Sequence, residues 1–282
     1  MFKKKAATSD SYFPLGSDIM RRTGNRLRKH LASLGETDLL RAFEEIYSLN
    51  EGYINTQFRI RPFVIEAHQE NRVLSFPRPL PLICLEHISF GYVEWLRRKY
   101  TLPGFVEVEK GDVVIDCGGF VGGFTVAVAP LAKRVLVVEP APTNAACIRL
   151  NTRDNANVEV LQLGLSNHDG LATLHLSSSG VEHSILAVDD GETVESIEIA
   201  SARLDTLLLE RDIKRPDFLK LEAEGFEPEI FEGTEHALPR KMAIDISPER
   251  DGESAGPLFE KVLTGLGYSV RVRRNVLFAR KD

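Results

Sequence analysis

A glycine-rich turn constrains the fold of this chain more than any other segment. It covers residues 116–123, Asp-Cys-Gly-Gly-Phe-Val-Gly-Gly, and directly follows an apolar run at 113–115 that predicts a strand. Glycines let the backbone turn sharply and approach a ligand closely, which a β-carbon would block. The helix predicted next would present free N–H groups and partial positive charge to that ligand. The segment therefore predicts a cofactor site in an α/β fold.

Three classes of cofactor use such a turn, and the spacing of the glycines separates them. A dinucleotide fingerprint requires G-x-G-x-x-G, but Phe120 occupies the place of the second glycine after Gly118. A phosphate-binding Walker A loop requires G-x-x-x-x-G-K before Ser or Thr. Gly118 and Gly123 match that spacing, but Phe124 replaces the lysine that clamps the phosphate. The spacing therefore disfavours both a dinucleotide site and a Walker A phosphate site.

The spacing D-x-G-x-x-x-G, here Asp116, Gly118 and Gly122, is the form used by methyltransferases that depend on S-adenosylmethionine (SAM). SAM offers an ammonium and a carboxylate instead of phosphates. We expect Asp116 to receive the ammonium and the helix N-terminus to receive the carboxylate. Glu139 ends the next predicted strand, 21 residues after Gly118, where an acidic side chain can accept both ribose hydroxyls.

After Pro103 the sequence alternates short apolar runs with helical stretches. The apolar runs predict strands at 113–115, 135–138, 158–163, 218–221 and 242–246. Helices are predicted between several of them, at about 123–132, 142–152, 228–237 and 255–265. Short apolar strands separated by helices are typical of parallel strands buried on both faces. The predicted fold class is therefore α/β, a Rossmann-like, mostly parallel sheet over residues 104–282.

Two segments depart from this alternation. Asp169-Gly170 is a turn signal that predicts a β-hairpin between the runs 158–163 and 172–176. Residues 268–273 and 276–281 alternate apolar and basic side chains, which predicts an antiparallel pair closing one edge of the sheet. A mostly parallel sheet that ends in an antiparallel hairpin is the arrangement of class I methyltransferases, and by itself this is a fold-level analogy.

Residues 1–103 predict a mainly helical extension. Apolar residues recur at helical spacing over about 18–48, and Gly35 followed by a capping pair indicates two helices there. Prolines interrupt any regular element over 53–90, and a further helix is predicted at about 88–100. This extension is expected to form either a cap over the carboxyl edge of the sheet or a dimer interface.

The chain resembles the FkbM family of SAM-dependent methyltransferases. The blocks that carry the resemblance occur in order at 114–122, 138–144, 151, 164–166, 169–170, 204–207, 219–227 and 233, within about residues 108–248. The resemblance implies methyl transfer to a hydroxyl of a sugar, glycolipid, polyketide or similar natural product. The predicted cofactor-binding set is Asp116, Gly118, Gly119, Gly122, Glu139, Asn144 and Ser166. Two residues depart from the family pattern: Phe120 stands where Asn is usual, and Glu222 stands where Asp is usual.

Four residues are the candidates for catalysis. Lys220, Glu222 and Glu224 alternate along a predicted strand, so they should project from one face at its carboxyl end. One carboxylate could orient or deprotonate an acceptor hydroxyl beside the lysine, although a structural ion pair is the alternative. His183 in a Ser/Gly-rich segment is an alternative base, or a solvated loop residue. Asp245 could contact the acceptor or cap the sheet.

Metal binding is not required by any spacing in this sequence. Oxygen ligands from Glu222, Glu224 and Asp245, with His183, could converge on Mg²⁺ or Ca²⁺. Methyl transfer is an in-line displacement at an activated carbon, so alignment of the acceptor can supply much of the rate. We therefore predict catalysis without a metal. The histidines without a companion at ligand spacing are expected to be exposed or satisfied; these are His30, His68, His87 and His236.

The cysteines and the N-terminus bear on location. Three cysteines lie far apart without a C-x-x-C pair, which argues against a disulfide framework and indicates a reducing compartment. The first ten residues lack the apolar region of a secretory signal, and no apolar run approaches the ~20 residues of a membrane span. A cytoplasmic protein is expected.

The charge distribution leaves alternatives for the acceptor. Residues 1–30 carry eight basic and two acidic side chains, whereas the whole chain has a net charge of −6. This basic head could recruit an anionic partner, such as RNA or a carrier-tethered substrate, or it could simply be solvated. No aromatic residues are interleaved with these charges, which argues against nucleic acid. A Rossmann-like binding module without catalysis is the remaining alternative.

Overall fold

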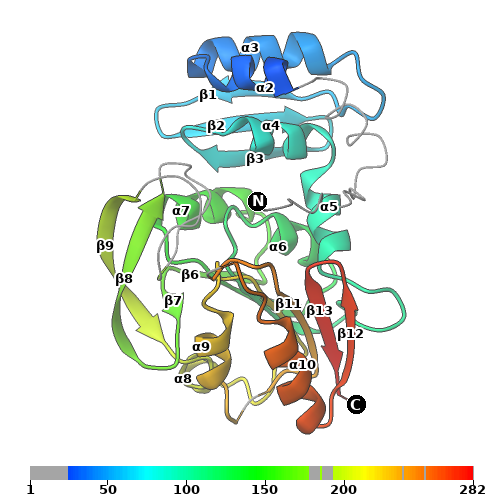
Figure 1. The fold of residues 1–282 in the computed structure, drawn as a ribbon, viewed down its shortest axis with the longest axis vertical. Helices are drawn as coiled ribbons and strands as arrows, with labels where there is room; N and C mark the ends of the chain where they lie inside the picture. The colour runs from blue at the N-terminus through cyan, green and yellow to red at the C-terminus, as the bar shows by residue number, and fades with distance from the viewer. Residues whose placement is uncertain (1–24, 178–184, 186–192, 237, 251, 282) are drawn as a thin grey trace, which may run out of the picture.

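The computed structural model describes residues 25–177, 185, 193–236, 238–250 and 252–281. Two regions stack along its long axis (Figure 1). The N-terminal extension lies at one end, and the larger sheet domain lies at the other. The basic head of residues 1–30 falls almost wholly outside the described residues.

A seven-stranded sheet in the order β12-β13-β11-β10-β4-β5-β6 forms the centre of the larger region. The parallel strands are β4 (Val113–Cys117), β5 (Arg134–Val138), β6 (Val158–Leu161), β10 (Phe218–Leu221) and β11 (Lys241–Asp245). The antiparallel strands are β12 (Ser269–Arg273) and β13 (Val276–Arg280). The predicted α/β fold class and the antiparallel C-terminal pair are therefore confirmed, with β12 at the edge.

Helices cover both faces of this sheet because its strands are apolar on both. Val114 of β4 faces one core, shared with the extension, whereas the next residue, Ile115, faces a second core. The helices are α6 (Gly123–Val128), α7 (Pro142–Asn151), α8 (Leu204–Glu210), α9 (Glu227–Glu232) and α10 (Gly256–Gly265). Four of them were predicted, although α6 and α9 are shorter than expected, and α8 was not.

The hairpin predicted at Asp169-Gly170 is wrong. A separate three-stranded sheet contains β7 (Gly164–Leu165), β8 (Gly170–Ser177) and β9 (Thr193–Ala202), in the order β7-β9-β8. The Asp169 carboxylate accepts hydrogen bonds from Arg203 N at 2.8 Å and Thr206 Oγ1 at 2.9 Å. The turn is thereby tied to the start of α8, and β8 pairs with the longer strand β9 instead of with β6.

The extension contains a small sheet that the sequence did not suggest. Its elements are α2 (Asn25–Ala32), α3 (Glu36–Tyr47), β1 (Gln57–Ile60), β2 (Val64–Gln69), β3 (Arg72–Pro77), α4 (Leu82–Ser89) and α5 (Tyr92–Lys99). Pro62 lies between β1 and β2, Pro77 ends β3, and Pro79 and Pro81 follow it, so the prolines leave the antiparallel sheet β1-β2-β3 intact. Gly91, with φ +97°, separates α4 from α5, so the helix predicted at 88–100 begins at Tyr92.

The extension packs directly against the sheet domain. Asn151 of α7 accepts a hydrogen bond from Ser75 N at 2.7 Å and donates one to Ser75 O at 2.9 Å, which binds α7 to β3. Tyr92 and Leu96 of α5 lie against Gly123, so closely that a β-carbon there would meet them at 2.4 and 2.5 Å. One hydrophobic core therefore continues across the predicted boundary at residue 103.

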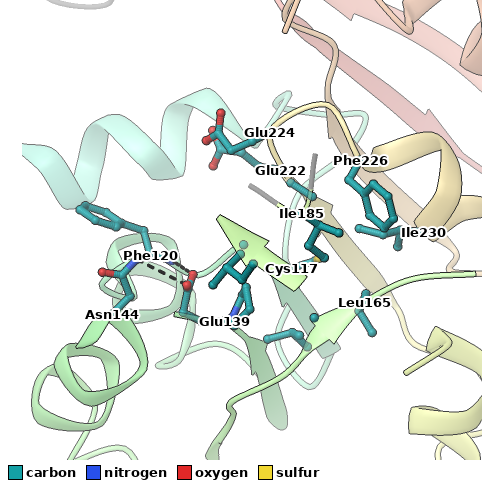
Figure 2. Close-up of a pocket in the computed structure, with 16 residues that line it drawn as sticks. Cys117, Phe120, Glu139, Asn144, Leu165, Ile185, Glu222, Glu224, Phe226 and Ile230 are labelled. Atoms are coloured by element: carbon teal, nitrogen blue, oxygen red, sulfur yellow. Dashed lines mark hydrogen bonds between the residues drawn. The ribbon is translucent and has the colours of Figure 1, made fainter. Parts of the chain in front are cut away.

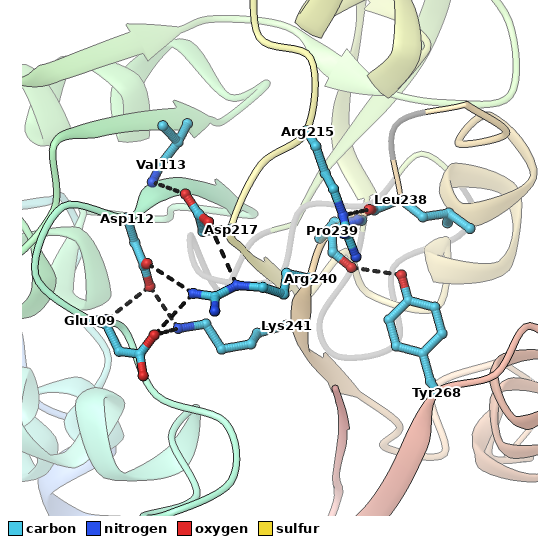
Figure 3. Close-up of polar contacts among 10 residues, drawn as sticks. All are labelled: Glu109, Asp112, Val113, Arg215, Asp217, Leu238, Pro239, Arg240, Lys241 and Tyr268. Atoms are coloured by element: carbon cyan, nitrogen blue, oxygen red, sulfur yellow. Dashed lines mark hydrogen bonds and ion pairs between the residues drawn. The ribbon is translucent and has the colours of Figure 1, made fainter. Parts of the chain in front are cut away.

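An ion-pair network joins the amino ends of the central strands (Figure 3). Lys241 Nζ lies 2.9 Å from a Glu109 oxygen and 2.8 Å from an Asp112 oxygen, and it is almost fully buried. Arg240 also contacts Glu109, at 2.9 Å, and Asp217 at 3.7 Å. This network closes the end of the sheet opposite the glycine-rich turn.

Candidate active site

The glycine-rich turn lies at the carboxyl end of β4, held against the chain that follows β10. Gly118 adopts φ +73°, and a β-carbon there would lie 1.7 Å from the carbonyl oxygen of Glu222. At Gly119 a β-carbon would lie 2.4 Å from Val137 Cγ1. Both positions therefore require glycine because the protein itself is close. The ends of three neighbouring strands, β4, β5 and β10, consequently meet at this turn.

A cleft of about 650 Å³, including space open to solvent, lies between this turn, the end of β5 and strand β7 (Figure 2). We call it the sheet-edge cleft. Gly118, Glu139 and Asn144 line it, as do Leu165 and Ile185.

Glu139, a predicted cofactor-binding residue, lines the sheet-edge cleft. Its carboxylate accepts hydrogen bonds from Phe120 N at 2.8 Å and Asn144 Nδ2 at 3.4 Å (Figure 2). It also accepts one from Ala141 N at 3.0 Å. Burial outweighs these hydrogen bonds and raises the pKa of Glu139 to about 7. The side chain is thus fixed in place and changes charge near neutral pH.

Asn144, which also lines the cleft, has a buried acceptor atom without a hydrogen-bond partner among the described residues. Its side chain is buried, and the atom without a partner is Oδ1. Buried polar atoms are nearly always paired in folded proteins, so an unpaired one beside a cleft indicates a place for a ligand donor.

The other predicted cofactor residues lie behind the sheet-edge cleft or beside it. Asp116 is fully buried; one carboxylate oxygen accepts a hydrogen bond from Thr125 Oγ1 at 2.6 Å, and the other lies 3.3 Å from Lys220 Nζ. Asp116 is not among the residues that line the cleft, and neither are Gly122 and Ser166. Asp116 Oδ1 has no hydrogen-bond partner among the described residues, and the role predicted for Asp116 toward the SAM ammonium stays a prediction.

A buried ion-pair network surrounds Lys220. Lys220 Nζ lies 3.0 Å from a Glu222 oxygen and donates a hydrogen bond to Cys117 O at 3.0 Å. Burial lowers the pKa of Lys220, but Glu222 and Asp116 outweigh it, and the net pKa is raised. Lys99 of α5 completes the network from the extension, 2.7 Å from the other Glu222 oxygen. Of the predicted cluster, Lys220 and Glu222 pair as expected, and Lys99 is a second lysine that the sequence did not indicate.

This ion-pair network sets the charge of Glu222 and so limits the part that its carboxylate can play in catalysis. Burial raises the pKa of Glu222, but Lys99 and Lys220 outweigh it, so the net pKa is lowered and the side chain stays ionised. Asp245 also pairs with Lys99, at 2.8 Å. Because β10 ends at Leu221, the strand alternation predicted through Glu224 is wrong. Glu224 instead follows the strand, with φ +50°.

A second and larger cavity adjoins the first. It measures about 1,110 Å³, including space open to solvent, and side chains of α4 and α5 form much of its wall. We call it the cap chamber. It shares four residues with the sheet-edge cleft, namely Gly118, Phe120, Glu222 and Glu224. Gly119 lines the cap chamber alone. His183, the alternative base, lies outside the described residues.

Residues 116–270 match the family profile described as the Methyltransferase FkbM domain. The chain belongs to the FkbM methyltransferase family. This family uses SAM, so SAM is the cofactor, as the spacing of the turn predicted. The match begins at the glycine-rich turn and ends in β12, whereas the extension lies outside it.

Relatives of known sequence or structure are distant. Over 242 residues the chain is 25% identical to the AMB antimetabolite synthetase AmbE of Pseudomonas aeruginosa, covering 70% of this chain but 11% of that protein. An FkbM methyltransferase from Methylobacillus flagellatus KT matches with a TM-score of 0.43 and 16% identity, over 69% of this chain and 52% of that one. Precorrin-6y C5,15-methyltransferase from Geobacter metallireducens GS-15 has a TM-score of 0.42 and 14% identity, over 74% of this chain and 94% of that one.

Three further observations concern the described residues only. No group of three or more potential ligand side chains among them is arranged to hold a metal ion. No helix in the described ranges has the length and apolar character needed to cross a membrane. Cys84, Cys117 and Cys147 are buried and not bridged.

Proposed function

We propose that this protein transfers the methyl group of SAM to a hydroxyl of a sugar, glycolipid, polyketide or related natural product. The observation that carries the proposal is the junction of the two cavities. The sheet-edge cleft and the cap chamber meet at Gly118, Phe120, Glu222 and Glu224. A methyl donor in one cavity and an acceptor in the other would meet at these residues, which is the proximity that methyl transfer requires.

The residues of the sheet-edge cleft fit SAM. Glu139 would accept the ribose hydroxyls, since its carboxylate is held at the end of β5. Asn144 offers its unpaired Oδ1 atom to a donor of the cofactor. Gly118 lines the cleft, so the backbone of the turn forms part of the cleft wall. When bound, SAM supplies a methyl group already activated by its positive sulfur.

At the junction, charged side chains would position the acceptor. Glu222 stays ionised between Lys99 and Lys220, so it is suited to accept a hydrogen bond from the acceptor hydroxyl. For the same reason Glu222 is a poor general base, because its pKa is lowered. Glu224 lines both cavities and is the better candidate for removing the hydroxyl proton; His183 remains a prediction.

The extension would act as a cap. Residues of α4 and α5 line the cap chamber, and Lys99 reaches into the ion-pair network of the sheet domain. These contacts favour the cap over the dimer interface as the role of residues 1–103. A cytoplasmic location and a homodimer through the N-terminal region remain predictions from the sequence.

A carrier-tethered acceptor is the second candidate. The chain resembles a stretch of a synthetase that makes an antimetabolite, although it spans only 11% of that protein. Such an acceptor would arrive covalently attached to a protein and would still present its reacting group to the cap chamber.

The test uses calorimetry and mass spectrometry on the full chain. Titration with S-adenosylhomocysteine should give micromolar binding to the wild type and weaker binding to Glu139→Gln. The matched control is Glu159→Gln. Glu159 lies on the neighbouring strand β6, and its carboxylate pairs with Arg134. Incubation with trideuteromethyl SAM and a panel of sugar and polyketide alcohols should then yield a labelled ether. Label found only on nitrogen or carbon would overturn the proposed O-methyl transfer.

A further inference from the structure

The cap chamber distributes polar and apolar side chains unequally. Its charged side chains are Lys220, Glu222 and Glu224, and the two glutamates are at the junction with the sheet-edge cleft. Away from the junction the wall is mostly apolar or aromatic, and it includes Phe76, Ile83, Ile88, Trp95, Leu96 and Phe124. The chamber is thus polar at one end and apolar along its body.

An aromatic surface forms part of that body. His87 and Trp95 stack with ring centroids 4.5 Å apart and planes at 28°. Tyr92 lies nearly parallel to Trp95, with centroids 6.3 Å apart and planes at 30°. Burial lowers the pKa of His87 to about 4, helped by Lys99 and Arg28, so its ring is uncharged at neutral pH. His87 covers one face of Trp95 in this stack, and Lys99 Nζ lies 5.7 Å from the centroid of the Trp95 ring. The chamber wall therefore offers aromatic edges and apolar side chains, against which another aromatic ring can pack.

The apolar lining of the chamber favours acceptors that carry few hydroxyls. A sugar carries a hydroxyl on most of its carbons, and each hydroxyl buried without a partner weakens binding roughly five- to a hundredfold. Along the apolar body of the chamber, few side chains could form hydrogen bonds with these hydroxyls. A molecule with a single hydroxyl could place that group at the charged end and bury the rest against Trp95 and Ile83.

We propose that the cap chamber binds an acceptor with a flat, apolar ring system and one hydroxyl at its end, in place of a polyhydroxylated sugar. This inference rests on the proposed O-methyl transfer and narrows its acceptor class. Phe120 lines both cavities, so an apolar ring lies at their junction as well as along the body of the chamber.

The binding test compares two probes in the full chain saturated with S-adenosylhomocysteine. We expect 2-naphthol to bind at least about tenfold more tightly than methyl β-glucopyranoside by calorimetry. Trp95→Ala should weaken 2-naphthol about tenfold and leave S-adenosylhomocysteine binding unchanged. Phe63→Ala is the matched control, because Phe63 is an aromatic residue of the same extension that is 83% exposed and lines neither cavity.

Two results would overturn the inference. One is glucoside binding as tight as that of 2-naphthol, and the other is 2-naphthol binding that Trp95→Ala leaves unchanged. If Trp95→Ala does not fold, Ile83→Asp places a charge on a chamber residue that is 38% exposed and should produce the same loss.

Labelled methyl transfer separates this inference from the proposed function. If 2-naphthol binds as expected but no acceptor alcohol receives label, the chamber assignment stands and O-methyl transfer fails. If sugars receive label on oxygen and 2-naphthol does not bind, O-methyl transfer stands and the narrower acceptor class fails.

Discussion

At each end of the central sheet a buried lysine is paired with two carboxylates. At the amino end Lys241 is buried between Glu109 and Asp112, and at the carboxyl end Lys220 is buried between Asp116 and Glu222. In each case a lysine in a parallel strand is almost inaccessible and is stabilised by two carboxylates. Judged by charge and burial alone, the two ends would be equally good candidates for an active site.

Their surroundings differ. Lys220 lies beside the glycine-rich turn and lines the cap chamber, whereas Lys241 lines neither the chamber nor the sheet-edge cleft. Lys241 contacts only Glu109 and Asp112 among the carboxylates drawn at the amino end of the sheet (Figure 3). A buried ion pair is therefore weak evidence of function until space for a ligand adjoins it.

The largest predicted effect contrasts one glycine at each end. Gly118→Ala should lower the free energy of unfolding by about 4 kcal/mol or more, since its β-carbon would overlap the Glu222 carbonyl oxygen. Gly111→Ala, beside the amino-end network, also has positive φ but meets nothing within 4 Å, so about 1–2 kcal/mol is expected. Urea unfolding measures both. Equal losses would show that the close approach at Gly118 is not required.

The second prediction contrasts the two lysines. Lys220→Met should lower the free energy of unfolding by roughly 3–5 kcal/mol, because it leaves the buried Asp116 carboxylate without its cation. Lys241→Met should lower it less, because Arg240 remains 3.4 Å from Asp112. Only Lys220→Met should also weaken S-adenosylhomocysteine binding, by about tenfold or more, because Lys220 holds the turn through Cys117 O and Asp116. Calorimetry at a temperature where both variants are folded distinguishes them. A matching loss of binding in Lys241→Met would remove the functional difference between the ends.

The smallest predicted effect concerns pH. Glu109, at the amino end, has a lowered pKa through its hydrogen bond with Lys241, whereas burial raises the pKa of Glu139 to about 7. Ribose hydroxyls donate to the ionised carboxylate, so affinity should be full above pH 7 and fall as pH drops through it. S-adenosylhomocysteine should therefore bind about tenfold more weakly at pH 6 than at pH 8. Titrations of Glu139→Gln over the same range should be flat, and a wild type that is equally flat would contradict this role for Glu139.

Features that depend on local spacing could be predicted from the sequence. They are the five parallel strands, four of the helices that follow them, the glycine-rich turn and Glu139 at the end of β5. The family followed from the same blocks. Such features are local because a strand, a turn and a helix are set by neighbouring residues.

Only the tertiary structure decided the contacts between distant segments. Lys99 reaches Glu222 from 123 positions away, and no pattern in the sequence indicates that meeting. The engagement of Asp116 with Thr125 and Lys220, and the pairing of β8 with β9, likewise depend on which partner arrives in space. The cap chamber exists only because α4 and α5 pack over the carboxyl ends of the strands, since a cavity between two regions is a property of their packing and not of either sequence segment.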